Sequence, residues 1–227
     1  MLDRIRGGLI VSCQALPNEP LHSSFIMGRM ARAATEGGAV GIRANTPEDI
    51  CEIAKNTLLP IIGIVKRDYP DSPIYITPTI REIAELAQTP CSMIAFDATD
   101  RPRPQGELLE DFVSKARRAA PGKKLMADVA TLDEAIRAEK FGFDCVSTTL
   151  MGYTAQSEGH NIADDDFARL KAILAAVHIP VIAEGHVDTP AKARRCIELG
   201  AHAVVTGGAI TRPQLITKTF TDAIYGK

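Results

Sequence analysis

The sequence lacks an excess of either charge and lacks a long apolar run. Its 227 residues include 26 lysines and arginines against 28 aspartates and glutamates, for a formal net charge of −2. Such a balance gives no general attraction to nucleic acid or to an anionic membrane surface. No apolar stretch approaches the roughly 20 residues of a membrane-spanning helix, and no signal-peptide core follows the charged first residues. We therefore expect a cytoplasmic protein without nucleic-acid or membrane partners.

Paired cysteines and metal-binding histidine motifs are also missing. The five cysteines are scattered along the chain without a C-x-x-C pair, which is typical of a reduced intracellular protein. The five histidines form neither an H-x-x-x-H pair nor a facial triad, so a zinc or iron site is disfavoured. We expect neither a metal nor another cofactor.

What the sequence does contain is a series of short apolar runs separated by helical patterns. The runs are rich in valine and isoleucine and show little polar alternation, as expected for parallel strands that are buried on both faces. Alternation of strands and helices predicts a parallel sheet with right-handed crossovers. The eight runs are Gly8–Gln14, Ala39–Ala44, Ile61–Arg67, Ser92–Ala98, Lys124–Ala130, Asp144–Leu150, Val181–Gly185 and Ala203–Gly207.

Eight such units within 227 residues predict a closed (β/α)8 TIM barrel that takes up residues 1–227 as a single domain. Helix-start signals support the count, including Thr46-Pro47 and the capping box that begins at Thr131. The alternative is an open doubly wound sheet. It is disfavoured because no G-x-G-x-x-G motif follows the first run.

Polar and charged residues stand where most of these runs end. The run-end residues include Gln14, Arg43, Lys66, Arg67, Asp97, Asp128, Thr149 and Glu184. A buried strand gains nothing from a charge at its end unless that charge is paired or used. Because the carboxyl ends of barrel strands meet at one rim, where barrel enzymes carry their chemistry, we predict a functional site there.

Lys66 is the most informative of these residues, because it closes the apolar run that starts at Ile61. Apolar surroundings and the nearby Arg43 and Arg67 are expected to lower its pKa. A neutral lysine could act as a general base or form a Schiff base with a carbonyl substrate. The alternative is a purely structural ion pair with Glu184 or Asp97.

Glycines after the last two runs suggest a phosphate site. Gly185 follows the seventh run, and Gly207 and Gly208 follow the eighth. The loops after strands seven and eight of barrels commonly bind phosphate through backbone N–H groups, which glycine lets approach closely. The alternative is that all three are ordinary turn glycines.

Eight segments, taken in order, resemble the N-acetylmannosamine-6-phosphate 2-epimerase family. They are GLIVSCQ, AVGIRA, IGIVKRDYP, FDATDR, MADV, TTLMGYT, VIAEG and VTGGAITRP. The resemblance implies a (β/α)8 barrel. It also implies interconversion of N-acetylmannosamine 6-phosphate and N-acetylglucosamine 6-phosphate, a step in bacterial sialic acid breakdown.

The resemblance also implies roles for individual residues. Lys66 and Glu184 match the catalytic positions. The positions that match substrate contacts are Gln14, Arg43, Asp128, Tyr153 and Arg212, and those that match phosphate loops are Gly185, Gly207 and Gly208. Two positions depart from the family pattern. His186 stands where the family usually has arginine or lysine, and Ala130 stands where many members have serine.

Three other functions stay open at this point. One is a metal-dependent pentose-phosphate 3-epimerase, another is a Schiff-base aldolase, and the third is a non-catalytic sugar-phosphate-binding protein. We also expect a homodimer, because the last predicted helix, Pro213–Tyr225, ends in a short apolar stretch.

Overall fold

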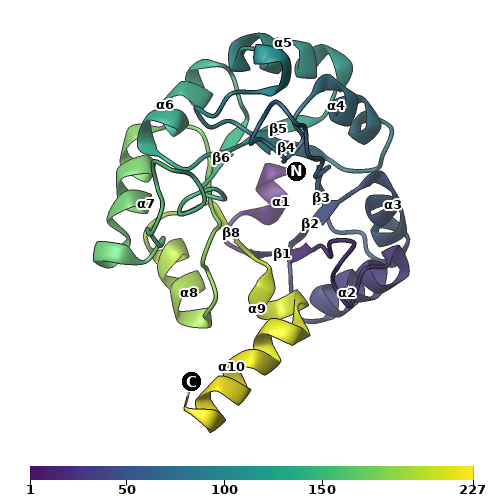
Figure 1. The fold of residues 1–227 in the computed structure, drawn as a ribbon, viewed down its shortest axis with the longest axis vertical. Helices are drawn as coiled ribbons and strands as arrows, with labels where there is room; N and C mark the ends of the chain where they lie inside the picture. The colour runs from purple at the N-terminus through teal and green to yellow at the C-terminus, as the bar shows by residue number, and fades with distance from the viewer. Residues whose placement is uncertain (227) are drawn as a thin grey trace.

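The computed structural model describes residues 1–226, and its eight parallel strands close into a barrel (Figure 1). Closure depends on the pairing of the first strand with the last, in which Leu9 lies opposite Val204 and Ile10 opposite Val205. The predicted barrel is confirmed, and the open doubly wound alternative is wrong. The strands are β1 (Leu9–Cys13), β2 (Gly41–Asn45), β3 (Ile61–Ile64), β4 (Met93–Asp97), β5 (Lys124–Asp128), β6 (Cys145–Ser147), β7 (Val181–Ala183) and β8 (Ala203–Thr206).

Helices form a ring outside the barrel (Figure 1). A helix follows each strand, as predicted. Among the described residues there are also two four-residue helices, α1 and α9, and a 3-10 turn, η1, all too short for a periodic pattern to reveal. The helices are α1 (Leu2–Ile5), α2 (Ser24–Glu36), α3 (Pro47–Asn56), α4 (Ile80–Ala87), η1 (Pro104–Gly106), α5 (Leu109–Ala119), α6 (Leu132–Lys140), α7 (Asp164–Ala176), α8 (Pro190–Glu198), α9 (Gly208–Thr211) and α10 (Pro213–Tyr225).

The predicted helix starts are found as side-chain caps. The Thr46 hydroxyl accepts a hydrogen bond from the Asp49 N–H at 3.2 Å at the start of α3. Thr131 and Glu134 form the reciprocal capping box of α6. These caps satisfy N–H groups that have no partner inside the helix, and so they fix where each helix begins.

Alternate residues of each strand point into the barrel, and their neighbours point toward the helices. The inner apolar set includes Ile10, Ile62, Met93, Met126 and Ile182. A second and larger apolar cluster fills the space between the strands and the helices. The alternation puts the last inward residues of the strands at one rim of the barrel.

The amino end of the barrel is closed by α1. Ile5 is fully buried against the inner apolar set. The His202 ring nitrogen Nε2 lies 3.0 Å from the Leu2 carbonyl oxygen, and the Gly7 N–H donates to the His202 carbonyl at 2.7 Å. The barrel therefore has an apolar floor, and its opening lies at the carboxyl end.

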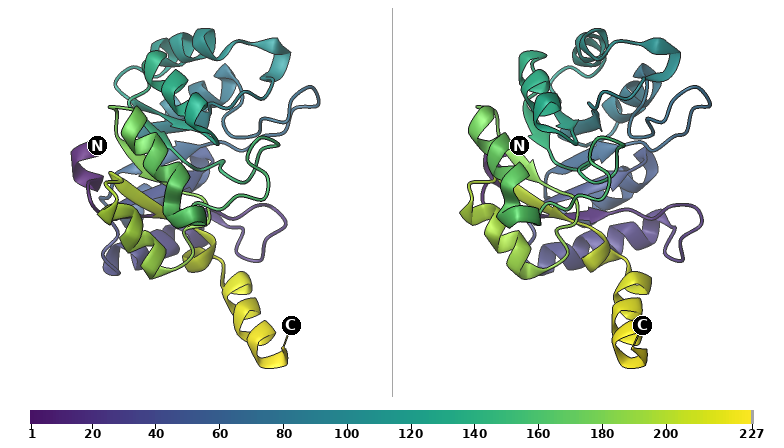
Figure 2. Two further views of the ribbon diagram at one scale, coloured as in Figure 1. Left: turned by 90° about the vertical axis from the view of Figure 1, so that its left-hand side faces the viewer. Right: turned by 60° about the vertical axis from the view of Figure 1, so that its left-hand side comes forward.

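Helix α10 projects away from the barrel instead of lying along it (Figure 2). None of its 13 residues is buried, whereas the equally long α2 and α7 each bury three. Among the described residues, no helix has both the length and the apolar character needed to span a bilayer.

Candidate active site

A cavity of about 840 Å³ opens at the carboxyl ends of the strands. It is bordered by the loops after several strands and by the start of α10. Nine of the ten predicted site residues line it: Gln14, Arg43, Lys66, Tyr153, Glu184, Gly185, Gly207, Gly208 and Arg212. The structure therefore brings together residues that lie far apart in the sequence.

Arg43, which follows Ile42 in β2, is the buried cation of the site, with its side chain 1% exposed. Its Nη1 and Nη2 donate to the two Asp128 carboxylate oxygens at 3.0 and 2.5 Å, and Nη1 also donates to Glu184 Oε2 at 2.8 Å. Such a paired arrangement holds a guanidinium in one orientation. Burial acts to lower the pKa of Arg43, but the two carboxylates outweigh it and raise the pKa, so Arg43 stays charged.

Glu184 follows β7 and competes with Asp128 for the charge of Arg43. Burial raises the pKa of Glu184 above its ordinary value, Arg43 opposes that rise, and Asp128 adds to it. Hydroxyl groups complete its surroundings, since Glu184 Oε2 lies 3.0 Å from Thr149 Oγ1 and 3.2 Å from Ser147 Oγ. A carboxyl with a raised pKa can hold a proton and pass it to a substrate oxygen.

Lys66 lies two residues beyond β3, where its N–H donates to Asn45 Oδ1 at 2.8 Å. Burial lowers its pKa to about 8, helped by Arg43 and Arg212 and opposed by Glu184 and Glu19. With this pKa, about a tenth of the side chain is neutral at pH 7 and about half at pH 8, which makes Lys66 a competent proton acceptor.

One expectation about the surroundings of Lys66 is wrong, and so is the alternative of a structural ion pair. Arg67 is not among the main causes of the lowered pKa of Lys66, because Arg67 turns away to pair with Glu82 and Glu85. A structural ion pair with Asp97 is also absent, because Asp97 binds Arg101 and the Thr99 hydroxyl. Within residues 1–226, Lys66 forms no ion pair with Glu184 either. The second cation beside Lys66 is Arg212, which comes from the far end of the chain.

Asp128 differs from the other predicted residues, because it is fully buried and does not line the cavity. It accepts from both terminal nitrogens of Arg43 and from Thr149 Oγ1 at 2.7 Å. Asp128 therefore orients the Arg43 side chain. A direct contact between Asp128 and a substrate stays a prediction.

Two buried polar atoms in the cavity wall have no hydrogen-bond partner. Among the described residues, the buried side-chain nitrogen and oxygen atoms in this state are Gln14 Oε1 and Arg212 Nε. The amide nitrogen of Gln14 is satisfied by Ser12 Oγ at 2.8 Å. Because buried polar groups are normally paired, the unpaired Gln14 Oε1 indicates a polar ligand. Arg212 Nε does not add to this argument, because it lies 2.7 Å from Glu19 Oε1 in an ion pair.

Two of the three glycines, Gly185 and Gly207, sit where a side chain would crowd the cavity wall, whereas a Cβ at Gly208 would make only an ordinary contact with Leu215. Gly185 has a φ of +89°, and a Cβ there would come within 3.1 Å of the Thr148 carbonyl oxygen. At Gly207 a Cβ would come within 3.2 Å of Ser12 Cβ. The glycine at 185 is therefore required by both the backbone conformation and the close approach of the loop after β6.

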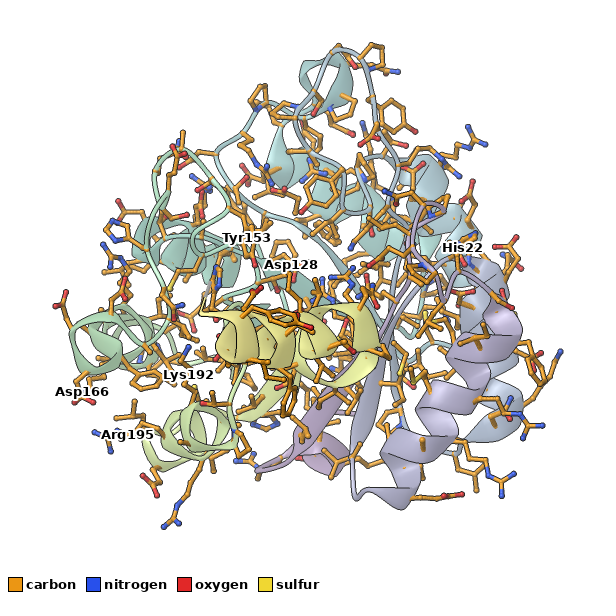
Figure 3. The ribbon with its side chains drawn as sticks, turned by 60° about the horizontal axis from the view of Figure 1, so that its bottom comes forward. His22, Asp128, Tyr153, Asp166, Lys192 and Arg195 are labelled. Atoms are coloured by element: carbon orange, nitrogen blue, oxygen red, sulfur yellow. The ribbon has the colours of Figure 1, made fainter. Side chains whose placement is uncertain are left out.

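Tyr153 and His186 form a stacked pair at the cavity edge, with ring centroids 5.0 Å apart and planes 5° from parallel. Figure 3 labels Tyr153 and Asp128 near the middle of the ring, whereas Asp166 and Arg195 lie at its margin. The stack joins the loop after β6 to the loop after β7. His186 therefore belongs to the site, although the family usually has arginine or lysine at this position.

Other cavity residues were not assigned from the sequence. Ser12 and Tyr75 line the cavity, and Glu19 pairs with Arg212 behind it. Ser12 carries a signal, as the polar residue inside an apolar strand, but Tyr75 and Glu19 lie in loops without regular spacing. Within residues 1–226, no group of three or more histidine, cysteine, aspartate and glutamate side chains is placed to hold a metal.

Fold and site together define a (β/α)8-barrel enzyme whose chemistry lies at the carboxyl end of its barrel. A family model described as "Putative N-acetylmannosamine-6-phosphate epimerase" matches residues 27–226. The chain belongs to this N-acetylmannosamine-6-phosphate 2-epimerase family, which confirms the resemblance found in the sequence.

Individual relatives agree with this assignment. A protein from Oceanobacillus iheyensis, with the name "Putative N-acetylmannosamine-6-phosphate 2-epimerase", is 61% identical over 97% of this chain and 99% of its own. One of the same name from Listeria monocytogenes is 52% identical over 99% of this chain and 94% of its own. The solved N-acetylmannosamine-6-phosphate 2-epimerase of Clostridium perfringens superposes with a TM-score of 0.93 at 58% identity, covering 98% of this chain and 96% of that one.

Proposed function

We propose that this enzyme interconverts N-acetylmannosamine 6-phosphate and N-acetylglucosamine 6-phosphate by moving the proton on C2, as a step in sialic acid catabolism in the cytoplasm. The observation that carries the proposal is the placement of Lys66 and Glu184. They come from separate strands, face one cavity, and have pKa values shifted toward the neutral forms that proton transfer requires.

The C2 proton is acidic only when C1 is a carbonyl, so the sugar reacts in its open-chain form. Neutral Lys66 takes the C2 proton. The electron pair of the C–H bond then forms the C1–C2 double bond and the carbonyl pair moves to O1, which gives an enolate that carries the acetamido group on C2. Glu184, whose pKa is raised by burial, is placed to assist proton movement at O1, and Arg43 supplies the fixed positive charge beside it. Stabilising the developing negative charge is typically worth a few kcal/mol. A proton returned to the opposite face then inverts C2.

The phosphate of the substrate is assigned to the loops after β7 and β8. Gly185, Gly207 and Gly208 present backbone there, and Arg212 adds a cation that also lines the cavity. Gln14 Oε1 is available to accept a hydrogen bond from a hydroxyl or amide of the sugar. A charge-assisted hydrogen bond from Arg212 would fix the phosphate in one orientation.

The test is to assay the purified protein with each sugar phosphate in deuterium oxide. The wild type should form the other epimer and exchange the C2 hydrogen. Lys66→Ala should lose both activities by about 10²–10⁴-fold, the usual contribution of general acid–base catalysis. Lys124→Ala, which removes an exposed lysine paired with Asp144, is the matched control. Exchange by Lys66→Ala at nearly the wild-type rate would disprove the role of Lys66.

The exchange assay, a borohydride-trapping experiment and a chelator control together distinguish the epimerase from the three alternative functions. A sugar-phosphate-binding protein would bind the substrate without exchanging C2 hydrogen. An aldolase would leave a borohydride-trapped adduct on Lys66. A metal-dependent epimerase would lose activity with a chelator, whereas we expect no change.

We propose further that the protein is a homodimer whose interface includes α10. Phe220 and Ile224 are 67% and 75% exposed on this projecting helix. A groove of about 390 Å³, lined in part by Leu9, Ile197 and Ile210, runs beside the β1–β8 seam and offers an apolar counterpart on a second copy. Light scattering should give a dimer mass for the wild type and a monomer mass for Phe220→Ser combined with Ile224→Ser.

A further inference from the structure

The loop between β1 and α2 meets the start of α10 across the β1–β8 seam, and Glu19 makes the connection. Its side chain is 17% exposed. Glu19 Oε1 lies 2.7 Å from Arg212 Nε, and Arg212 Nη2 donates to Oε2 at 3.1 Å. The Nε contact is close enough for an ion pair but is not aligned as a hydrogen bond. One edge of the guanidinium is therefore held by a carboxylate.

The Glu19 carboxylate is itself held in place. The Leu16 N–H donates to Oε2 at 2.7 Å, and Gln214 Nε2 donates to Oε1 at 3.2 Å. Its backbone lies in two successive turns, with the N–H donating to the Leu16 carbonyl and the carbonyl accepting from the His22 N–H. Burial acts to raise the pKa of Glu19, but the Leu16 N–H, Arg212 and Lys66 together lower it. Glu19 is thus an ionised and immobilised anchor.

The position of Glu19 relative to the cavity decides what the anchor does. Arg212 lines the cavity, whereas Glu19 is not among the described residues that line it. Glu19 therefore stands behind Arg212 and does not occupy the place of a ligand. We propose that Glu19 is a positioning residue that holds the Nε–Nη2 edge of Arg212, so that the rest of the guanidinium faces the phosphate of the substrate. The inference rests on the proposed function, because that function supplies the phosphate.

Glu19 has a second effect, on the charge around Lys66. The charged groups that act on Lys66 are Arg43 from β2, Arg212 at the start of α10, Glu184 after β7 and Glu19 in the loop after β1. The two arginines lower the pKa of Lys66 and the two glutamates raise it. Removing the charge of Glu19 should therefore lower the pKa of Lys66 further. A residue that only stabilised the loop would have no such effect.

The experiment compares Glu19→Gln, which keeps the shape and removes the charge, with Glu19→Asp and with the wild type. For Glu19→Gln we expect KM for the sugar phosphate to rise about tenfold, the usual cost of losing a hydrogen bond to a charged group, while kcat stays within about twofold. Inorganic phosphate binding, measured by calorimetry, should weaken by the same factor. The acidic limb of the kcat profile should move to lower pH. Glu19→Asp keeps the charge and should restore that limb.

Glu198→Gln is the matched control, because it removes an exposed carboxylate that pairs with Arg194 away from the cavity. It should leave KM, phosphate binding and the pH profile unchanged. The inference is overturned if Glu19→Gln keeps wild-type KM and phosphate affinity, even if its thermal stability falls, or if kcat falls while KM does not change. The calorimetric arm needs no turnover. If the wild type failed to epimerise the sugar phosphate, the proposed function would fail, and the phosphate arm would still test Glu19.

Discussion

The two ends of the barrel interior are built from the same strands and have opposite character. At the amino end, Ile62 and Met126 are fully buried among apolar side chains. Four residues beyond Ile62 is Lys66, and two residues beyond Met126 is Asp128. One or two steps along an inward-facing register therefore change the interior from a packed core to a cluster of charges.

The apolar amino end of the barrel stabilises the fold, whereas the charged carboxyl end provides the groups of the site. Apolar burial at the amino end lowers the free energy of the folded state. Buried charges at the carboxyl end carry a desolvation cost that is offset only while each keeps its partner. The following substitutions break or sharpen this contrast, from the largest expected effect to the smallest.

Arg43→Ala should have the largest effect on stability. It leaves Asp128 and Glu184 buried without their shared cation, a loss of about 3–5 kcal/mol for a broken buried pair. Urea unfolding would measure it. Arg117→Ala, which removes a partly exposed partner of Asp144, should cost at most about 1 kcal/mol. Equal unfolding midpoints for the two variants would contradict the conclusion that Arg43 stabilises the buried Asp128 and Glu184.

Ile62→Ala tests the apolar end of the strand that leads to Lys66. Truncating a fully buried isoleucine should cost about 2–5 kcal/mol of unfolding free energy, with kcat nearly unchanged below the new melting temperature. Lys66→Ala should do the reverse, with activity lost and stability kept or raised. Leu58→Ala, at a position 91% exposed, should change neither. A large fall in kcat for folded Ile62→Ala would show that the two ends are not separable.

Gly185→Ala should cost about 1–3 kcal/mol through backbone strain alone. A further cost should come from its new Cβ, which would lie 3.1 Å from the Thr148 carbonyl oxygen. Gly142 gives the matched control, since its φ is +82° but a Cβ there would meet nothing within 4 Å. Thermal unfolding should therefore rank Gly142→Ala above Gly185→Ala in stability. Identical melting temperatures for the two variants would show that the close contact with the Thr148 carbonyl oxygen has no measurable cost.

A pH dependence set by Lys66 gives a further test. Because its pKa falls from 10.5 to about 8 in the fold, kcat should rise with pH up to about 8 and then level off. The free energy of unfolding should change with pH in the same direction as kcat. Between the two pKa values the unfolded chain binds more protons than the folded one, so unfolding free energy should rise with pH there. Lys66→Ala should remove that rise, and its persistence in the variant would assign it to another group.

The fold could be predicted from the sequence because its signals are local. Caps such as Thr46 and Thr131 mark helix starts, and the apolar runs mark strands without reference to distant residues. The predicted last helix, Pro213–Tyr225, has the bounds of α10. Helices α1 and α9 were missed because four residues are too few to show a period.

Nine of the ten predicted site residues line the cavity, but the contacts that these residues make could not be predicted. Strand-end positions placed Lys66 and Glu184 at one rim, since all parallel strands end there. Which cations lie beside Lys66 depends on loop paths, so the sequence indicates the adjacent Arg67, whereas the structure places Arg212 there. Glu19 gave no signal, because its partner Arg212 is 193 residues away and the loop that carries it has no periodic pattern.

The pairing of β1 with β8 has a consequence for how the protein is made. A ribosome releases the chain from its amino end, and β1 cannot meet its second neighbour until Thr206 has emerged. Until then, β1 and the newest strand each expose an edge that could pair with another chain, and contacts between such distant segments form slowly. We expect the barrel to close only at the end of synthesis, and a chain that stops before β8 to aggregate.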